Sequence, residues 1–140
     1  MVTVRKTLEL AKNKHKGQVD KCEIPYIWHV IRVARRVKRT DEKIVALLHD
    51  VVEDTDTSFE EIRKLGVSEE IIDAIDLLTH RKGVVYEEYV RNIAKNALAR
   101  AVKLADLADN TDPKRMERLP YDVKQRLLKK YETALLILQE

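Results

Sequence analysis

Cysteine, glycine and proline are scarce in this sequence, and long apolar runs are missing. The single cysteine, Cys22, cannot form an intramolecular disulfide, and no cysteine pair suggests a zinc finger, so we expect a reducing, cytoplasmic environment. Three glycines and three prolines are too few for a turn-rich sheet protein. No stretch approaches the ~20 apolar residues that span a bilayer, and the first residues lack the apolar centre of a secretory signal, so no membrane partner is expected.

Charged residues make up 36% of the chain, yet the formal net charge is only +3. Basic residues alternate with acidic ones and do not form a basic block. Nucleic acid is therefore not expected as the main partner. A length of 140 residues suits a single domain, 1–140, with one core. With 44% hydrophobic residues and few helix breakers, the composition predicts an all-α fold.

Hydrophobic spacing predicts seven or eight helices, joined by short polar turns, that pack as a compact bundle. Pro25 suits the first turn of the second helix, and Asp41 is the expected N-cap of the third. Ser58 opens a capping-box sequence, and Ser68 begins the helix that follows. The expected helices cover about 3–15, 25–38, 41–54, a short stretch after 58, 68–80, 86–95, 97–110 and 122–139.

Two of the expected helices carry polar side chains opposite their apolar stripes. A projection at about 100° per residue places His29 opposite the apolar stripe of the second helix. On the third helix, His49, Asp50 and Glu53 lie away from the stripe. Such a polar side either faces water, as it does on most amphipathic helices, or lines a polar site.

The expected helix at 97–110 is apolar almost all round, which indicates a buried helix. Lys103, Asp106 and Asn110 form a narrow polar strip along it. A buried carboxylate needs a cationic partner, and either Lys103 or a metal ion could serve Asp106. Two histidines and two carboxylates from three helices would form a mixed nitrogen and oxygen site, which suits Mn²⁺ or Fe²⁺.

Three blocks of sequence carry these residues, and their order resembles that of a known family. The order His29, then His49-Asp50, then Asp106 is similar to the H...HD...D motif of the HD-domain phosphohydrolases. ALLHDVVEDT resembles the HDxxED segment of the RelA/SpoT-type alarmone hydrolases, and VKLADLADNT resembles their KLADxxxN segment. HKGQVDKCEIPYIWHVIRVA is similar to the stretch that carries their first metal-binding histidine.

The resemblance implies an all-helical HD-domain bundle that binds Mn²⁺ and removes the 3′-pyrophosphate from guanosine tetra- or pentaphosphate. No synthetase domain fits within 140 residues, so we expect a stand-alone hydrolase. Glu53 and Asp54 match the family's ED pair, one helical turn beyond the HD pair, where they would orient water and handle protons. Asn110 matches a nucleoside-contacting asparagine, although a polar residue at a helix C-terminus is the alternative interpretation.

The sequence departs from the family where substrate is bound. Asp20-Lys21 stands where the alarmone hydrolases usually have a basic pair, and an acidic residue cannot stack on a base as arginine does. Lys21 could still meet a phosphate. Arg81 lies in an expected loop from which it could reach a phosphate, unless it is simply solvated. His80 matches no metal position and is interpreted as a helix-end residue.

Two other functions stay open on the sequence alone. An HD-type phosphatase acting on a nucleoside monophosphate or a phosphorylated dinucleotide would use the same metal set. A non-catalytic nucleotide-binding module would keep the fold without turnover, although it would have no evident need for so many converging polar groups. His15, outside these motifs, is expected at the surface or at the edge of the core.

Overall fold

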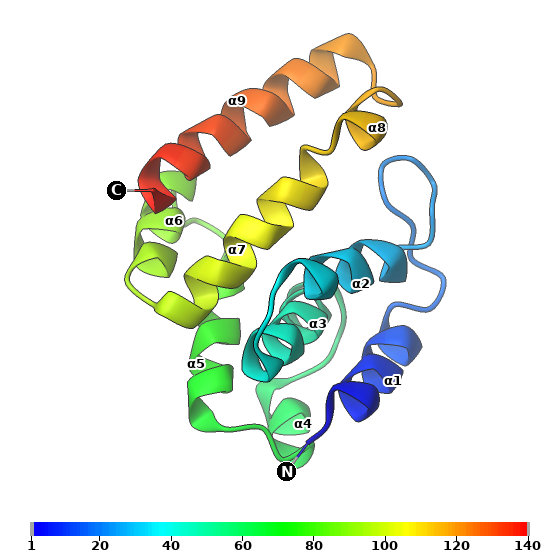
Figure 1. Cartoon of the computed structure of the whole chain (residues 1–140), viewed down its shortest axis with the longest axis vertical. Helices are drawn as coiled ribbons and strands as arrows, with labels where there is room; N and C mark the ends of the chain where they lie inside the picture. Colours follow the sequence, from blue (N-terminus) through cyan, green and yellow to red (C-terminus); the bar gives the residue numbers. More distant parts are fainter. Residues whose placement is uncertain (1, 140) are drawn as a thin grey trace.

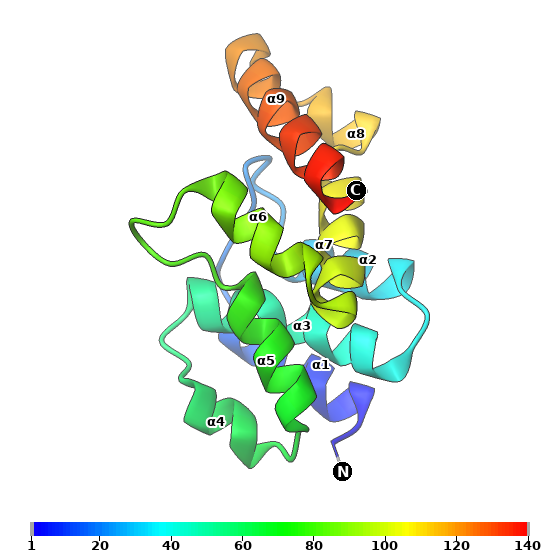
Figure 2. The same ribbon diagram turned by 90° about the vertical axis from the view of Figure 1, so that its left-hand side faces the viewer.

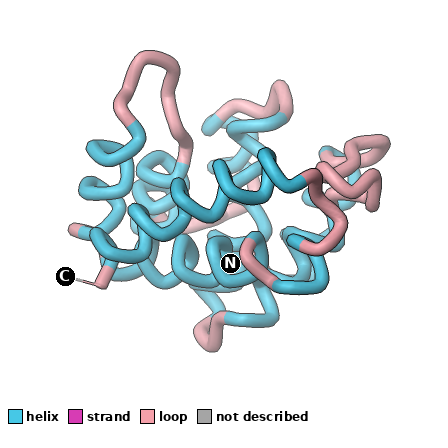
Figure 3. Tube along the Cα trace, turned by 90° about the horizontal axis from the view of Figure 1, so that it is seen from above, coloured by secondary structure: helices cyan, strands magenta, loops and turns pink. Residues whose placement is uncertain are grey.

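The computed structural model describes residues 2–139, which form nine helices and no strand (Figures 1 and 3). This confirms the all-α prediction. The helices are α1 Val4–Lys14, α2 Ile27–Arg36, α3 Thr40–Asp54, α4 Phe59–Lys64, α5 Glu69–Leu78, α6 Tyr86–Ala94, α7 Ala97–Asn110, α8 Pro113–Met116 and α9 Tyr121–Leu138.

Local hydrogen bonds explain where several helices begin. Ser58, Ser68 and Asn96 are N-caps, and each side chain accepts a backbone N–H from the residue three positions later. The short helix α8, which the sequence analysis did not predict, is opened by Asp112, whose carboxylate accepts the backbone N–H of Lys114. Four helical residues leave no hydrophobic period to detect.

Two predicted helix starts are wrong. The third helix has Arg39 as its N-cap instead of Asp41, because the backbone N–H of Arg39 donates to the Glu42 carboxylate at 2.9 Å. Asp41 lies in the first turn, where its charge favours the helix N-terminus. The second helix begins at Ile27 because Pro25 forms an isolated β-bridge with Val19, which holds Pro25 in the preceding loop.

Helix α3 lies at the centre of the fold and packs against α1, α2, α5 and α7 (Figures 1 and 2). All eight residues from 44 to 51 are buried, so every side of this helix meets another part of the protein. His49 and Asp50 are therefore not part of a solvated face, whereas Glu53 and Asp54 at the end of α3 are exposed. Among residues 2–139, no helix is long and apolar enough to cross a membrane.

A second layer is formed by α6 and α9, which pack against each other and against α7 (Figure 2). The loop between α1 and α2 approaches α8, since Cys22 Sγ lies 3.8 Å from the carbonyl oxygen of Arg115. Between these parts, α7 contacts both α3 and α9. The polar strip of α7 therefore lies where the two layers meet.

We predict that the packing of α3 dominates stability. Leu48→Ala removes a fully buried side chain and should lower the free energy of unfolding by about 2–5 kcal/mol, because it leaves a cavity. Leu136→Ala is the matched control, as Leu136 on α9 is 64% exposed, and it should change stability by less than about 0.5 kcal/mol. Denaturant unfolding monitored by circular dichroism measures both, and equal losses would contradict the prediction.

Candidate metal centre

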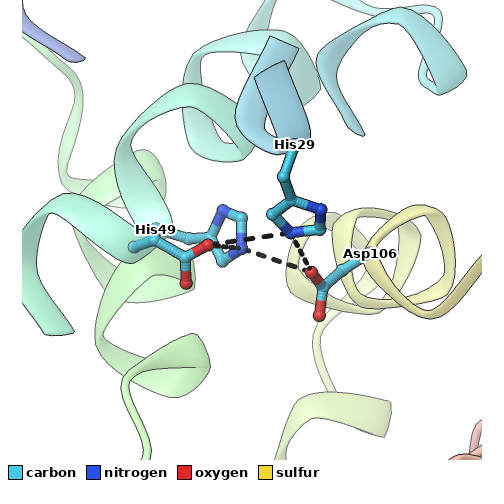
Figure 4. Close-up of side chains that lie close together, drawn as sticks. His29, His49 and Asp106 are labelled. Atoms are coloured by element: carbon cyan, nitrogen blue, oxygen red, sulfur yellow. Dashed lines mark hydrogen bonds and ion pairs between the residues drawn. The ribbon is translucent and has the colours of Figure 1, made fainter. Parts of the chain in front are cut away.

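Four polar side chains converge from three helices at the interface of α2, α3 and α7 (Figure 4). One ligand atom from each of His29, His49, Asp50 and Asp106 lies within 4.8 Å of the others. His29 Nε2 is 2.9 Å from Asp106 Oδ1, and His49 Nε2 is 3.2 Å from Asp50 Oδ2. All four residues are buried, and they are the four that the sequence analysis chose as metal ligands.

Hydrogen bonds on the far side of each imidazole orient the two histidines. His49 Nδ1 lies 2.7 Å from the carbonyl oxygen of Ala46, which can only accept, so Nδ1 carries the proton and Nε2 the lone pair. His29 Nδ1 lies 2.6 Å from the Asp109 carboxylate, which favours the same tautomer. In the neutral form of each ring, Nε2 is therefore the atom that carries the lone pair and faces the carboxylates.

The buried Nε2 atom of His49 has no well-directed hydrogen bond within the described structure. A lone pair facing carboxylate oxygens needs a positive charge between them, either a proton or a metal ion. Although burial disfavours the imidazolium, hydrogen bonds with Asp106 and Asp109 outweigh it and raise the pKa of His29 to about 9. The site thus favours positive charge, and its donor set could hold a divalent metal ion.

Asp106 uses its two oxygens differently. Oδ1 faces His29, while Oδ2 lies 3.3 Å from Nζ of Lys103. From the sequence, Asp106 could either pair with Lys103 or belong to the ligand cluster. In the structure it does both. Burial alone would raise the pKa of Asp106, but the charge of Lys103 and the hydrogen bond with His29 hold it well below the usual range.

Glu53 and Asp54 lie one turn beyond the HD pair, where α3 ends at the mouth of the site. Asp50, Glu53 and Asp54 form a second cluster of carboxylates whose oxygens lie close together. Glu53 accepts the backbone N–H of His80 at 2.8 Å, which holds its carboxylate in place. Burial, followed by the charges of Asp50 and Glu53, raises the pKa of Asp54 to about 6.

A network that the sequence analysis missed supports His29. Asp109 is 1% exposed, and besides His29 it binds Arg32 Nε at 2.8 Å and Arg115 Nη1 at 2.8 Å. The sequence signal that could have identified Asp109 is its position one helical turn after Asp106 on a buried helix. Tyr26 was also missed, and its hydroxyl donates to Asp50 Oδ2 at 2.6 Å.

A hollow of about 390 Å³ opens over the cluster, and a second hollow of about 400 Å³ adjoins it. Lys21 and Asn110, the predicted substrate contacts, line both, together with Tyr26 and Tyr131. Asn110 donates to Asp106 Oδ1 at 3.3 Å, and Thr111 takes the C-cap position, so Asn110 is not the cap.

Asp20 does not present a free charge to these hollows. Its Oδ1 accepts the backbone N–H groups of Cys22 and Ile24, and its Oδ2 lies 3.2 Å from Nη2 of Arg115. The acidic residue that departs from the family pattern therefore shapes the loop and is neutralised by Arg115, while Lys21 stays exposed at the hollow.

Arg81 is not brought to the cluster. It is exposed, it binds Asp76 at 2.6 Å, and it lines a separate hollow. The ion pair with Asp76 holds it outside the hollow over the cluster, so the expected phosphate contact is not supported by its position. His15, expected at the surface or the core edge, is only 2% exposed, because its ring packs against Tyr26.

The arrangement of helices matches that of a solved HD-type hydrolase. A structure described as a metazoan ortholog of SpoT that hydrolyses ppGpp superposes with a TM-score of 0.78 at 28% identity, over 96% of this chain and 84% of that chain. No protein-family model matches the chain. The chain has the all-helical HD fold, as the sequence predicted.

The similar sequences are named as alarmone hydrolases. This chain is 39% identical over 116 residues to the guanosine-3′,5′-bis(diphosphate) 3′-pyrophosphohydrolase MESH1 of Drosophila melanogaster, and covers 64% of its length. It is 34% identical over 119 residues to the guanosine-3′,5′-bis(diphosphate) 3′-pyrophosphohydrolase of Aquifex aeolicus, of which it covers 17%. The resemblance to the RelA/SpoT-type hydrolases seen in the sequence is confirmed.

We predict that substitutions in the ligand cluster differ from a substitution of Glu53 in their effect on metal retention. His49→Ala or Asp50→Ala should abolish metal retention and turnover, whereas Glu53→Gln should retain metal and lose most activity, because Glu53 lies outside the buried four. Metal analysis of the purified variants measures this. A metal-free Glu53→Gln variant beside a metal-replete His49→Ala variant would contradict the assignment.

We also predict that Asp109 tightens metal binding through His29. Asp109→Asn keeps the size of the side chain but removes the charge that orients the imidazole, so affinity for Mn²⁺ should fall by about 10–100-fold. Calorimetric titration of the chelator-stripped protein measures this, with Asp73→Asn on the exposed side of α5 as the control. Unchanged affinity with unchanged helix content would show that Asp109 does not support the ligand.

Proposed function

We propose that this protein is a metal-dependent phosphohydrolase, with guanosine 3′,5′-bis(diphosphate) as its substrate and pyrophosphate as a product. The observation that carries the proposal is the buried ligand cluster of two imidazoles and two carboxylates beneath a hollow of nucleotide size. Lys21 and Asn110 at that hollow suit phosphate and nucleoside contacts. The names of the similar proteins support the choice of substrate.

Mn²⁺ is the proposed cofactor, and Fe²⁺ is the alternative. His29, His49, Asp50 and Asp106 would hold it, and such a mixed nitrogen and oxygen set suits either ion. When bound, a divalent ion polarises a phosphoryl oxygen and lowers the pKa of water. No thiolate competes in the cluster.

The protein's own residues would position and deprotonate water. In the hydrolysis, a water oxygen bonds to the phosphorus attached to the 3′ oxygen, and the bond from that phosphorus to the 3′ oxygen breaks. The electron pair stays on the 3′ oxygen, which takes a proton, and pyrophosphate leaves. We assign Glu53 and Asp54 to orienting the water and accepting its proton, since they flank the cluster at its open side.

Lys103 would hold Asp106 in place during this step. Its ammonium group lies 3.3 Å from Asp106 and 5.3 Å from the centre of the Tyr89 ring, so it lies at the wall of the hollow.

We further propose a single domain with a cytoplasmic location. One continuous hydrophobic core supports the former, and the single cysteine supports the latter.

The proposal predicts Mn²⁺-dependent cleavage of guanosine tetraphosphate. The chelator-stripped protein should show no turnover, and added Mn²⁺ should restore formation of GDP and pyrophosphate, which chromatography resolves. Release of orthophosphate from a nucleoside monophosphate or a phosphorylated dinucleotide would instead identify an HD-type phosphatase. Metal-replete protein that binds the nucleotide without turnover would indicate a non-catalytic module.

A further inference from the structure

A lysine on α9 lines the metal pocket. Lys130 on α9 lines the same hollow as His49, Asp50 and Asp106, and its ammonium group lies 4.6 Å from the centre of the Tyr86 ring. Sequence analysis did not select either residue. Since α9 and α6 pack together, Lys130 and Tyr86 come from two elements and meet at one wall of the pocket.

Both side chains lack polar partners within the described structure. Lys130 forms no ion pair among residues 2–139, whereas Lys103, Arg32 and Arg115 all pair with carboxylates near the site. The hydroxyl of Tyr86 is buried without a hydrogen bond. Burial, together with the positive charges of Lys103 and Lys21, lowers the pKa of Lys130, so an anion at this wall would relieve a repulsion.

The wall continues outward into a second, smaller hollow of about 300 Å³ between α6 and α9. Tyr86 and Lys130 line this hollow as well, and Arg126 and Lys129 add two more cations. Positions 126, 129 and 130 lie on one face of α9 because they are three and four residues apart. Glu87 is the one acidic residue that lines it, so positive charge prevails.

The hollow that adjoins the metal pocket at Lys21, Asn110 and Tyr131 has a different character. The hollow next to Lys21 and Asn110 is walled by Val19, Leu119, Leu127 and Tyr131, whose apolar and aromatic surfaces suit a nucleoside. A substrate with its nucleoside there and its reacting phosphorus at the ligand cluster would extend toward Lys130. The group attached beyond the reacting phosphorus is the terminal phosphate of a 3′-pyrophosphate.

We propose that Tyr86 and Lys130 form a subsite for the terminal phosphate of a 3′-pyrophosphate, and that Arg126 and Lys129 extend its positive field. This inference rests on the proposed function and refines it. Lys130 offers a charge-assisted hydrogen bond and Tyr86 a hydroxyl donor, both of which suit a phosphate. The subsite would make the protein prefer a pyrophosphate over a monophosphate at the 3′ position.

Two nucleotides that differ only in the terminal 3′ phosphate test the subsite. Guanosine 3′,5′-bis(diphosphate) should bind more tightly than guanosine 5′-diphosphate 3′-monophosphate to the metal-loaded Glu53→Gln protein, which should retain metal and lose most of its turnover. Adding Lys130→Met should reduce the ratio of the two affinities by about tenfold, as expected for one charged hydrogen bond. Lys130→Arg should restore most of it. Calorimetry measures each dissociation constant.

Lys124→Met is the matched control, since Lys124 lies on α9 but lines neither hollow, and it should leave the ratio unchanged. An equal loss of affinity for both nucleotides, or weaker binding of GDP, would overturn the subsite and place Lys130 at the 5′ phosphates. Failure of the proposed function would be visible separately, as absence of Mn²⁺-dependent turnover in the protein without substitutions.

Discussion

Burial of opposite charges between α2, α3 and α7 is the constraint on which the rest of the structure depends. Two carboxylates and two imidazoles meet there with almost no access to water, and such groups are costly to bury unless positive charge compensates them. Lys103 supplies part of that charge at Asp106. The remaining lone pairs point at one another, so the folded chain maintains a place for a cation.

The support of this cluster extends well beyond the four ligands. Asp109 holds His29, Arg115 holds Asp109, and the same guanidinium reaches Asp20 in the loop before α2. The loop that presents Lys21 is thereby connected to His29 through three successive ion pairs. Rigid support of this kind fixes ligand geometry and reduces the cost of ordering the site when substrate binds.

Local sequence determined most of the helices and all four members of the cluster. The period of apolar residues and the caps Ser58, Ser68 and Asn96 are local signals, so helix positions could be predicted to within a few residues. The cluster could be predicted because its residues occur at motif spacing on three helices. The first residue of α3 was mistaken because the bond from the Arg39 backbone N–H to the Glu42 carboxylate outweighs the N-cap preference of Asp41.

Tertiary structure alone decided which charges face the pocket. Arg81 and Lys130 are both basic residues with polar neighbours in the sequence. In the structure, Arg81 pairs with Asp76, whereas Lys130 lines the hollow over the ligand cluster. Asp20 is neutralised by Arg115, which follows it by 95 residues. The sequence by itself determined the helices and the four residues of the cluster because these depend on local periodicity and motif. The wall of the hollow over the cluster depends on the packing of α6, α7 and α9, which no local pattern records.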